Sequence, residues 1–167
     1  MMLSRRGALT AFSGLAAAGA LPSIVRAEPA DSLIVYDGQL RNGWANWSWA
    51  TVDLVAQFDG RRAIKIEGGA YSALQLHRSG FSTKGLSKII VTLNGGPDGG
   101  QKIGVVTSTE EKHLDPYKMF DDLAANTWRT IETPLAECGA ADTVLAGVLL
   151  QSPMAYKPYY VSMIRFA

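Results

Sequence analysis

Three of the four tryptophans of the chain fall within six residues, at Trp44, Trp47 and Trp49. A tryptophan ring has a large, flat, apolar face and a single N–H donor. Such a ring can stack on the apolar C–H face of a sugar while its N–H reaches a hydroxyl. The cluster is therefore the first candidate for a ligand-binding surface.

The spacing of the three rings distinguishes them from one another. Trp47 and Trp49 are two residues apart, so on a strand they point to the same face. One face of a strand usually packs inward, and we therefore expect Trp49 to lie in the core. Trp44 follows the polar stretch Arg41-Asn42-Gly43, which is typical of a loop. We expect Trp44 to be the most exposed ring of the three and a platform for a ligand.

Several polar and aromatic residues further along the chain could complete such a site. Gln75 and His77 share one face of a predicted strand, and with Arg78 they could hydrogen-bond hydroxyl groups. The alternative for His77 is an ordinary polar residue on a solvated sheet face. Tyr71 and Trp128 are further candidates for stacking. The predicted ligand-binding residues are Trp44, Trp47, Tyr71, Gln75, His77, Arg78 and Trp128.

We expect the other reactive side chains to be structural or solvent-exposed, and we assign no catalytic residue. The segment from Glu110 to Asp115 contains acids and a histidine, but we expect it to be a solvated loop. Cys138 is the only cysteine, so no intrachain disulfide can form, and we expect it to be a small buried filler. The glycine-rich stretch 95–100 has no Lys-Ser/Thr after it, which excludes a nucleotide loop and favours a hairpin connection.

Short β-rich segments separated by glycine-rich or polar turns run through the chain, and no amphipathic helix interrupts them. Many short strands at this spacing indicate an all-β fold, an antiparallel β-sandwich of the jelly-roll type. One long polar connection covers 109–126, with a helical turn expected at Asp121–Leu123. The nine predicted strands are 33–36, 52–58, 63–67, 71–76, 88–93, 103–106, 128–133, 144–151 and 159–166.

The first 27 residues have the features of a signal peptide. Arg5 and Arg6 form a twin-arginine pair, a weakly apolar stretch follows, and Val25-Arg26-Ala27 resembles a cleavage site. The paired arginines favour the twin-arginine export route over the Sec route, which stays open. The hydrophobicity of this stretch is too low for a membrane anchor. We therefore expect residues 28–167 to form one exported domain, periplasmic or secreted.

The charge of the chain after the leader excludes one class of partner. The leader contains three arginines and no acid, so 13 basic residues remain against 15 acidic ones, a formal charge of −2. This balance gives no electrostatic attraction to nucleic acid or to an anionic membrane. The remaining 140 residues are enough for one domain with a real core.

Several motifs together resemble secreted bacterial β-jelly-roll domains akin to carbohydrate-binding modules. They are Tyr36-Asp37-Gly38, Gly43-Trp44-x-x-Trp47-Ser48-Trp49, Gly69-Ala70-Tyr71, the double glycines at 95–100, Thr127-Trp128-Arg129 and Tyr159-Tyr160-Val161. The resemblance spans essentially the whole chain after the leader. It implies a non-catalytic domain that binds a polysaccharide or oligosaccharide through aromatic side chains, alone or beside a separate secreted enzyme.

Related jelly rolls often hold a structural Ca²⁺, and the resemblance raises that question here. The last strand of this chain reads Val161-Ser162-Met163 and lacks the acid that such sites use. Asp37 and Asp53 remain as candidate ligands, although calcium takes six to eight oxygens. The alternative for Asp37 is that it only forms the Asp-Gly turn.

Two other functions stay open. Gln75-Leu76-His77 resembles the Gln-Ile/Val-His triplet of jelly-roll alginate lyases, which implies a polysaccharide lyase with His77 acting beside a uronate. The arginine-rich strand of those enzymes is missing. The third candidate is an envelope protein that binds another protein through an exposed apolar patch.

Overall fold

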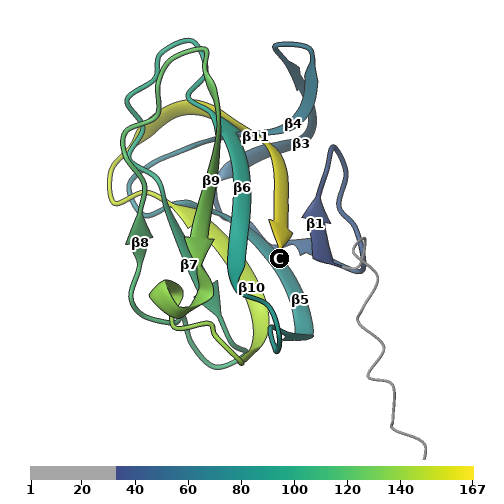
Figure 1. Cartoon of the computed structure of the whole chain (residues 1–167). Coiled ribbons are helices and arrows are strands. Elements are labelled where there is room, and N and C mark those ends of the chain that lie inside the picture. Colours follow the sequence, from purple (N-terminus) through teal and green to yellow (C-terminus); the bar gives the residue numbers. More distant parts are fainter. Residues whose placement is uncertain (1–32) are drawn as a thin grey trace, which may run out of the picture.

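The protein folds into two antiparallel β-sheets packed face to face. The structure, a computed structural model, describes residues 33–167, and the predicted leader lies outside them. Figure 1 shows the two layers, with β6, β9 and β11 in one and β5, β7 and β10 in the other. This arrangement confirms the predicted all-β, antiparallel sandwich.

The first sheet has six strands in the order β3-β4-β11-β6-β9, with β1 also paired to β11. Its strands are β1 (Ile34–Tyr36), β3 (Thr51–Phe58), β4 (Arg61–Gly68), β6 (Lys88–Asn94), β9 (Trp128–Pro134) and β11 (Tyr156–Phe166). The second sheet has five strands in the order β2-β5-β10-β7-β8. Its strands are β2 (Ala45–Asn46), β5 (Ala73–Ser82), β7 (Gly104–Ser108), β8 (Lys118–Met119) and β10 (Val144–Gln151).

All nine predicted strands are present; most ends shift by one to three residues, but the strand predicted at 71–76 is β5, which runs on to Ser82. The two-residue strands β2 and β8 and the short 3₁₀ helix η2 (Leu135–Cys138) were not predicted. The helical turn expected at Asp121–Leu123 is wrong. The Leu123 N–H donates to the carbonyl of Gln101 at 3.1 Å, so this segment runs extended beside its neighbour. Leu123 itself is buried in the core.

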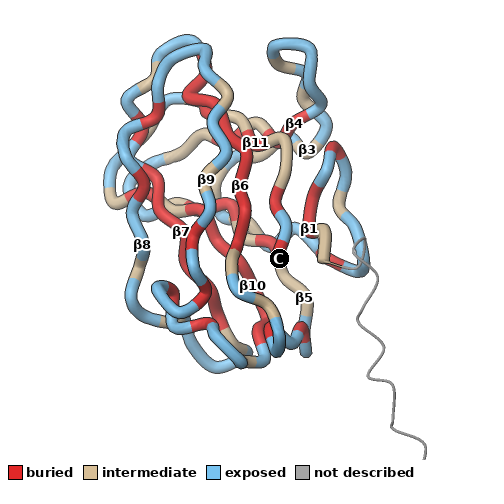
Figure 2. The backbone as a smooth tube through the Cα atoms, in the orientation of Figure 1, coloured by how far each residue is buried: buried red, intermediate tan, exposed pale blue. Residues whose placement is uncertain are grey.

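The core lies between the sheets and is built from the inward-pointing residues of the longer strands. Figure 2 shows long buried stretches on the central strands, such as β6. From the second sheet, Leu74 and Leu76 of β5 and Val148 and Leu150 of β10 point inward. Residues of opposite parity on these strands therefore face outward. The outward-facing side of the five-stranded sheet, called the outer face below, is where the candidate site lies.

Trp44 belongs to this core, and the expectation that it is an exposed platform is wrong. Its side chain is 5% exposed, and its ring packs against Phe81 and Phe166 at centroid distances of 5.5 and 6.2 Å. Arg41-Asn42-Gly43 does turn, and the Trp44 N–H closes that turn on the Arg41 carbonyl at 2.9 Å. After this turn, the Trp44 ring packs into the apolar space between the two sheets.

The glycine-rich stretch 95–100 is not a hairpin connection, because it joins β6 of one sheet to β7 of the other. Its glycines permit close packing of backbone. A Cβ at Gly95 would lie 2.6 Å from the Ala124 carbonyl oxygen, and one at Gly99 would lie 2.6 Å from the Ala125 nitrogen. Gly99 also has a φ of +66°, in the left-handed region that glycine tolerates.

Candidate functional site

Three large aromatic side chains are exposed beside the first half of β5, in the five-stranded sheet. Trp47 is 58% exposed, Trp49 48% and Tyr71 66%. The Trp47 N–H donates to the Gln75 carbonyl at 2.9 Å, and the Trp49 N–H donates to the Ala73 carbonyl at 3.2 Å. The segment that carries the two tryptophans thus runs beside β5 and presents both rings on the outer face. We call these three residues the aromatic platform.

Trp47 and Trp49 do share a face, as the spacing predicts, but the expectation that Trp49 is core is wrong. The opposite, inward-facing side of this segment carries smaller side chains. The Ser48 hydroxyl accepts from the Gln75 N–H at 3.0 Å and so fastens the segment to β5. Ala50 packs against the core cluster. Because these residues occupy the inner side, the two indole rings are left on the outside.

Tyr71 is held in an unfavourable backbone conformation. Its φ is +62°, a region that non-glycine residues seldom adopt. Its N–H donates to the Ser152 carbonyl at 2.7 Å, and its carbonyl accepts from Trp49 Nε1 and Gln151 Nε2, each at 2.8 Å. Three hydrogen bonds therefore fix the peptide of a residue whose ring touches little. Strained residues that the surroundings hold in place cluster at functional sites.

The outer face beside the platform is set by the strand register. Three cross-strand rows run from β5 over β10 to β7: His77, Gly147 and Ser108; Gln75, Leu149 and Val106; Ala73, Gln151 and Gly104. Ala73, Val106 and Leu149 form a small apolar cluster with Tyr117. The Tyr117 hydroxyl donates to the Gln151 carbonyl, and burial raises the pKa of this phenol to about 12. The floor is therefore apolar at its centre and polar toward His77.

A pocket of about 200 Å³ opens at the polar end of this floor, next to Trp47. Gly147 makes room for it, because a Cβ there would lie only 2.6 Å from the Ser108 hydroxyl oxygen and 3.5 Å from Gln75 Nε2. The pocket is lined by Trp47, Gln75, His77, Ser108, Thr109, Glu110, Glu111, Lys112 and His113. Hydrogen-bonding side chains from two strands and one loop thus converge beside an exposed aromatic ring.

His77 contacts both Trp47 and Glu110. Its ring lies parallel to that of Trp47, with centroids 3.5 Å apart and an interplanar angle of 1°. Its Nε2 is 3.6 Å from a carboxylate oxygen of Glu110. A hydrogen bond from Ser79, aided by His77, lowers the pKa of the Glu110 carboxyl from its ordinary value of 4.5. Glu110 is therefore a fixed negative charge at neutral pH.

The remaining predicted ligand residues do not join this group. Trp128 lies on β9, in the other sheet, where it packs edge-on to Phe58 and beneath the guanidinium of Arg61, 4.8 Å from its centroid. Arg78 lies over the ring of Phe81 at 5.3 Å and does not line the pocket. Of the predicted set, Trp47, Tyr71, Gln75 and His77 are the residues that the fold brings together.

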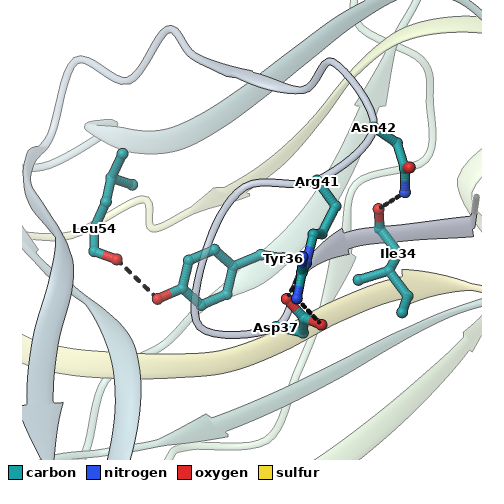
Figure 3. A network of polar contacts seen from close by, with 6 residues as sticks. All are labelled: Ile34, Tyr36, Asp37, Arg41, Asn42 and Leu54. Atoms are coloured by element: carbon teal, nitrogen blue, oxygen red, sulfur yellow. Dashed lines mark hydrogen bonds and ion pairs between the residues drawn. The ribbon is translucent and has the colours of Figure 1, made fainter. Parts of the chain in front are cut away.

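The two candidate calcium ligands, Asp37 and Asp53, make other contacts, and Figure 3 shows those of Asp37. The Asp37 carboxylate accepts two hydrogen bonds from the Arg41 guanidinium, at 2.7 and 3.1 Å. The Asp53 carboxylate accepts the Val55 N–H at 2.9 Å. Within residues 33–167, no three His, Cys, Asp or Glu side chains gather as a metal-binding group.

Sequence reasoning missed Ser108, Glu110 and Gly147. Glu110 was expected in a solvated loop, and its side chain is indeed 59% exposed, yet it faces His77. The two meet because β10 lies between β5 and β7 with a glycine at that position. Nothing in the local sequence reveals that register. Cys138 is buried in η2 as expected, and burial raises the pKa of its thiol to about 11.

Solved structures of family 29 carbohydrate-binding modules share this fold. One structure of a variant of CBM29-2 has a TM-score of 0.58 at 14% identity, over 80% of this chain and 89% of that one. A variant complexed with cellulohexaose gives 0.56 at 17% identity, over 80% and 88%. A variant complexed with mannohexaose gives 0.54 at 14% identity, over 80% and 89%. At this identity the similarity establishes the fold.

The other comparisons add no closer relationship, since no protein-family model and no curated protein matches the chain. In the part of the chain that the structure describes, no helix has the length and apolar character needed to cross a membrane.

Proposed function

We propose that this protein binds a glycan chain without changing it chemically, on the outer face of the five-stranded sheet. The rings of Trp47, Trp49 and Tyr71 stack on the apolar faces of successive sugars. Gln75 and other polar groups of the pocket beside Trp47 hydrogen-bond the hydroxyl groups at that end. Polar groups of this kind fix the orientation of a ligand that apolar surface attracts.

The observation that carries this proposal is the presence of three exposed aromatic residues beside the first half of β5. Exposed aromatic rings gathered in one place indicate a binding site more strongly than scattered apolar residues do. Trp49 Nε1 donates to the backbone carbonyl of Tyr71, so the Trp49 ring is held in place before any ligand arrives. Binding to a preorganised surface loses less conformational entropy.

The fold gives independent support for a sugar ligand. The CBM29-2 variants with this architecture were solved with cellulohexaose and mannohexaose, which are linear oligosaccharides of neutral sugars. We therefore propose a linear polysaccharide or oligosaccharide as the ligand class. We also propose, from the predicted leader, that the domain is exported and meets its glycan in the periplasm or outside the cell.

A lyase is less well supported by the geometry. A histidine that acts as a base must present a nitrogen to the substrate. The Nε2 atom of His77 is buried and faces Glu110, while one face of its ring is covered by Trp47. These contacts favour a role for His77 in supporting the Trp47 ring over a role as a base.

A glycan panel tests the proposal. The domain would be titrated with neutral and uronate oligosaccharides while tryptophan fluorescence and the absorbance of unsaturated products are followed together. We expect a fluorescence change with neutral hexasaccharides and no product, and loss of the change in Trp47→Ala. Product that disappears in His77→Ala would establish the lyase instead. No change in either fluorescence or product absorbance would contradict glycan binding and favour a protein partner.

A further inference from the structure

We propose that Glu110 and His77 position Trp47 for stacking, so that the affinity of the platform depends on the charge of His77. The consequence for affinity rests on the proposed function. The underlying contact does not, because it can be measured without a ligand.

The first step is the support beneath Trp47. At 3.5 Å and 1°, the imidazole and the indole are in full parallel contact, so His77 occupies one face of the Trp47 ring. The His77 side chain is only 12% exposed, whereas Trp47 is 58% exposed. Trp47 thus has one face against a nearly buried partner and the other available to a ligand. Without that partner, an exposed tryptophan would sample several rotamers and would bind less tightly.

The second step is the support of His77 itself. Its Nε2 atom is buried and makes no hydrogen bond with the described residues, and the Glu110 carboxylate is 3.6 Å away. Glu110 comes from the loop after β7, two strands away from β5. It can approach His77 because Gly147, between them, has no side chain. His77 is therefore in contact with the Glu110 carboxylate at its Nε2 atom and with the Trp47 indole at one face of its ring.

The third step is the effect of charge. A protonated imidazole makes an ion pair with Glu110 and a cation–π contact with Trp47, and a neutral one loses both. Histidine is the side chain that ordinarily changes charge between pH 5 and 8. The lowered pKa of Glu110 keeps its carboxylate ionised throughout that range. Protonation of His77 should therefore strengthen its contacts with Glu110 and Trp47 and favour binding.

Other groups face the same pocket and must be controlled for. The loop after β7 also supplies Glu111, Lys112 and His113, and β5 supplies Gln75. Ser79 of β5 does not line the pocket but hydrogen-bonds Glu110. Of these, His113 is the second histidine, and histidine is the side-chain type that ordinarily changes charge between pH 5 and 8. The variant His113→Gln separates the two histidines.

The ligand-free test is a fluorescence titration from pH 5 to pH 8. A protonated imidazole in contact with an indole quenches its emission, so the wild type should brighten as the pH rises. His77→Phe keeps a flat ring beneath Trp47 but cannot titrate, and should abolish the transition. His113→Gln should retain it. A transition that persists in His77→Phe, or its absence from the wild type, would overturn the proposal.

The binding test uses cellulohexaose at pH 5.5 and pH 8.0. Wild type should bind about threefold more tightly at pH 5.5, a factor in keeping with one exposed ion pair and one cation–π contact. Glu110→Gln should shrink this ratio, and His77→Phe should show the same affinity at both values. His77→Ala, which removes the support, should bind about tenfold more weakly at both.

The outcomes separate the two claims. Wild-type affinity in His77→Ala, or an unchanged pH ratio in His77→Phe, would overturn the positioning role. If the fluorescence transition vanishes in His77→Phe but no form of the protein binds any glycan, the contact stands and the proposed function fails.

Discussion

Replacing Trp44 with alanine is expected to lower the free energy of unfolding by about 3–5 kcal/mol. The side chain is 5% exposed and packs on Phe81 and Phe166, so its removal leaves a cavity between the sheets. Dispersion contacts and apolar burial are lost together. A domain of this size has a total stability of about 5–15 kcal/mol, so the loss is a large fraction of the whole.

Urea denaturation followed by circular dichroism measures this effect. Trp44→Phe is the matched variant, since it keeps an aromatic ring against Phe81 and removes an indole N–H that has no hydrogen-bond partner among the described residues. We expect it to cost about 1–2 kcal/mol. Trp49→Ala should cost about 1 kcal/mol, the value of one hydrogen bond. Equal losses for Trp44→Ala and Trp49→Ala would contradict the assignment of Trp44 to the core.

Replacing Tyr71 with glycine is expected to stabilise the protein and to weaken binding. The φ of +62° costs a non-glycine residue about 1 kcal/mol, which glycine avoids. The ring is 66% exposed, so its loss removes little packing. We expect the free energy of unfolding to rise by about 0.5 kcal/mol after the greater backbone entropy of glycine is subtracted. The affinity for a hexasaccharide should fall at least tenfold, because one stacking ring is gone.

Asp59→Gly is the matched control for this prediction. Asp59 also has a positive φ, +48°, but lies in the β3–β4 turn of the other sheet. It should change stability by a similar or smaller amount and leave affinity unaltered. Denaturation and calorimetric titration of the two variants give both quantities. Destabilisation by Tyr71→Gly would contradict the backbone strain, and unchanged affinity would mean that the Tyr71 ring does not bind the ligand.

The strands of this fold could be predicted because each is a short apolar or alternating run that ends at a turn. Val144–Gln151 is an uninterrupted apolar run, and β10 has those bounds. The two-residue strands could not be found this way, since β2 forms only by lying against β5. A pairing that depends on a distant strand leaves no local periodicity.

The candidate site was predicted only in part. The pattern Trp47-Ser48-Trp49 correctly placed two rings on one face, but hydrophobicity alone favoured the wrong face. The decisive contacts are those of Ser48 with the β5 backbone and of Ala50 with the core, both set by tertiary packing. Glu110 is the clearest omission, since its approach to His77 depends on a glycine on a third strand.

The central claim is that Trp47 and Trp49 bind sugar. The most direct test is isothermal titration of cellulohexaose and mannohexaose into the wild type and into the double variant Trp47→Ala/Trp49→Ala. The control is Trp128→Ala, which removes an aromatic ring from the other sheet. We predict saturable binding by the wild type and by Trp128→Ala, with no measurable heat of binding for the double variant. Binding that survives in the double variant, or is lost in Trp128→Ala alone, would contradict this account.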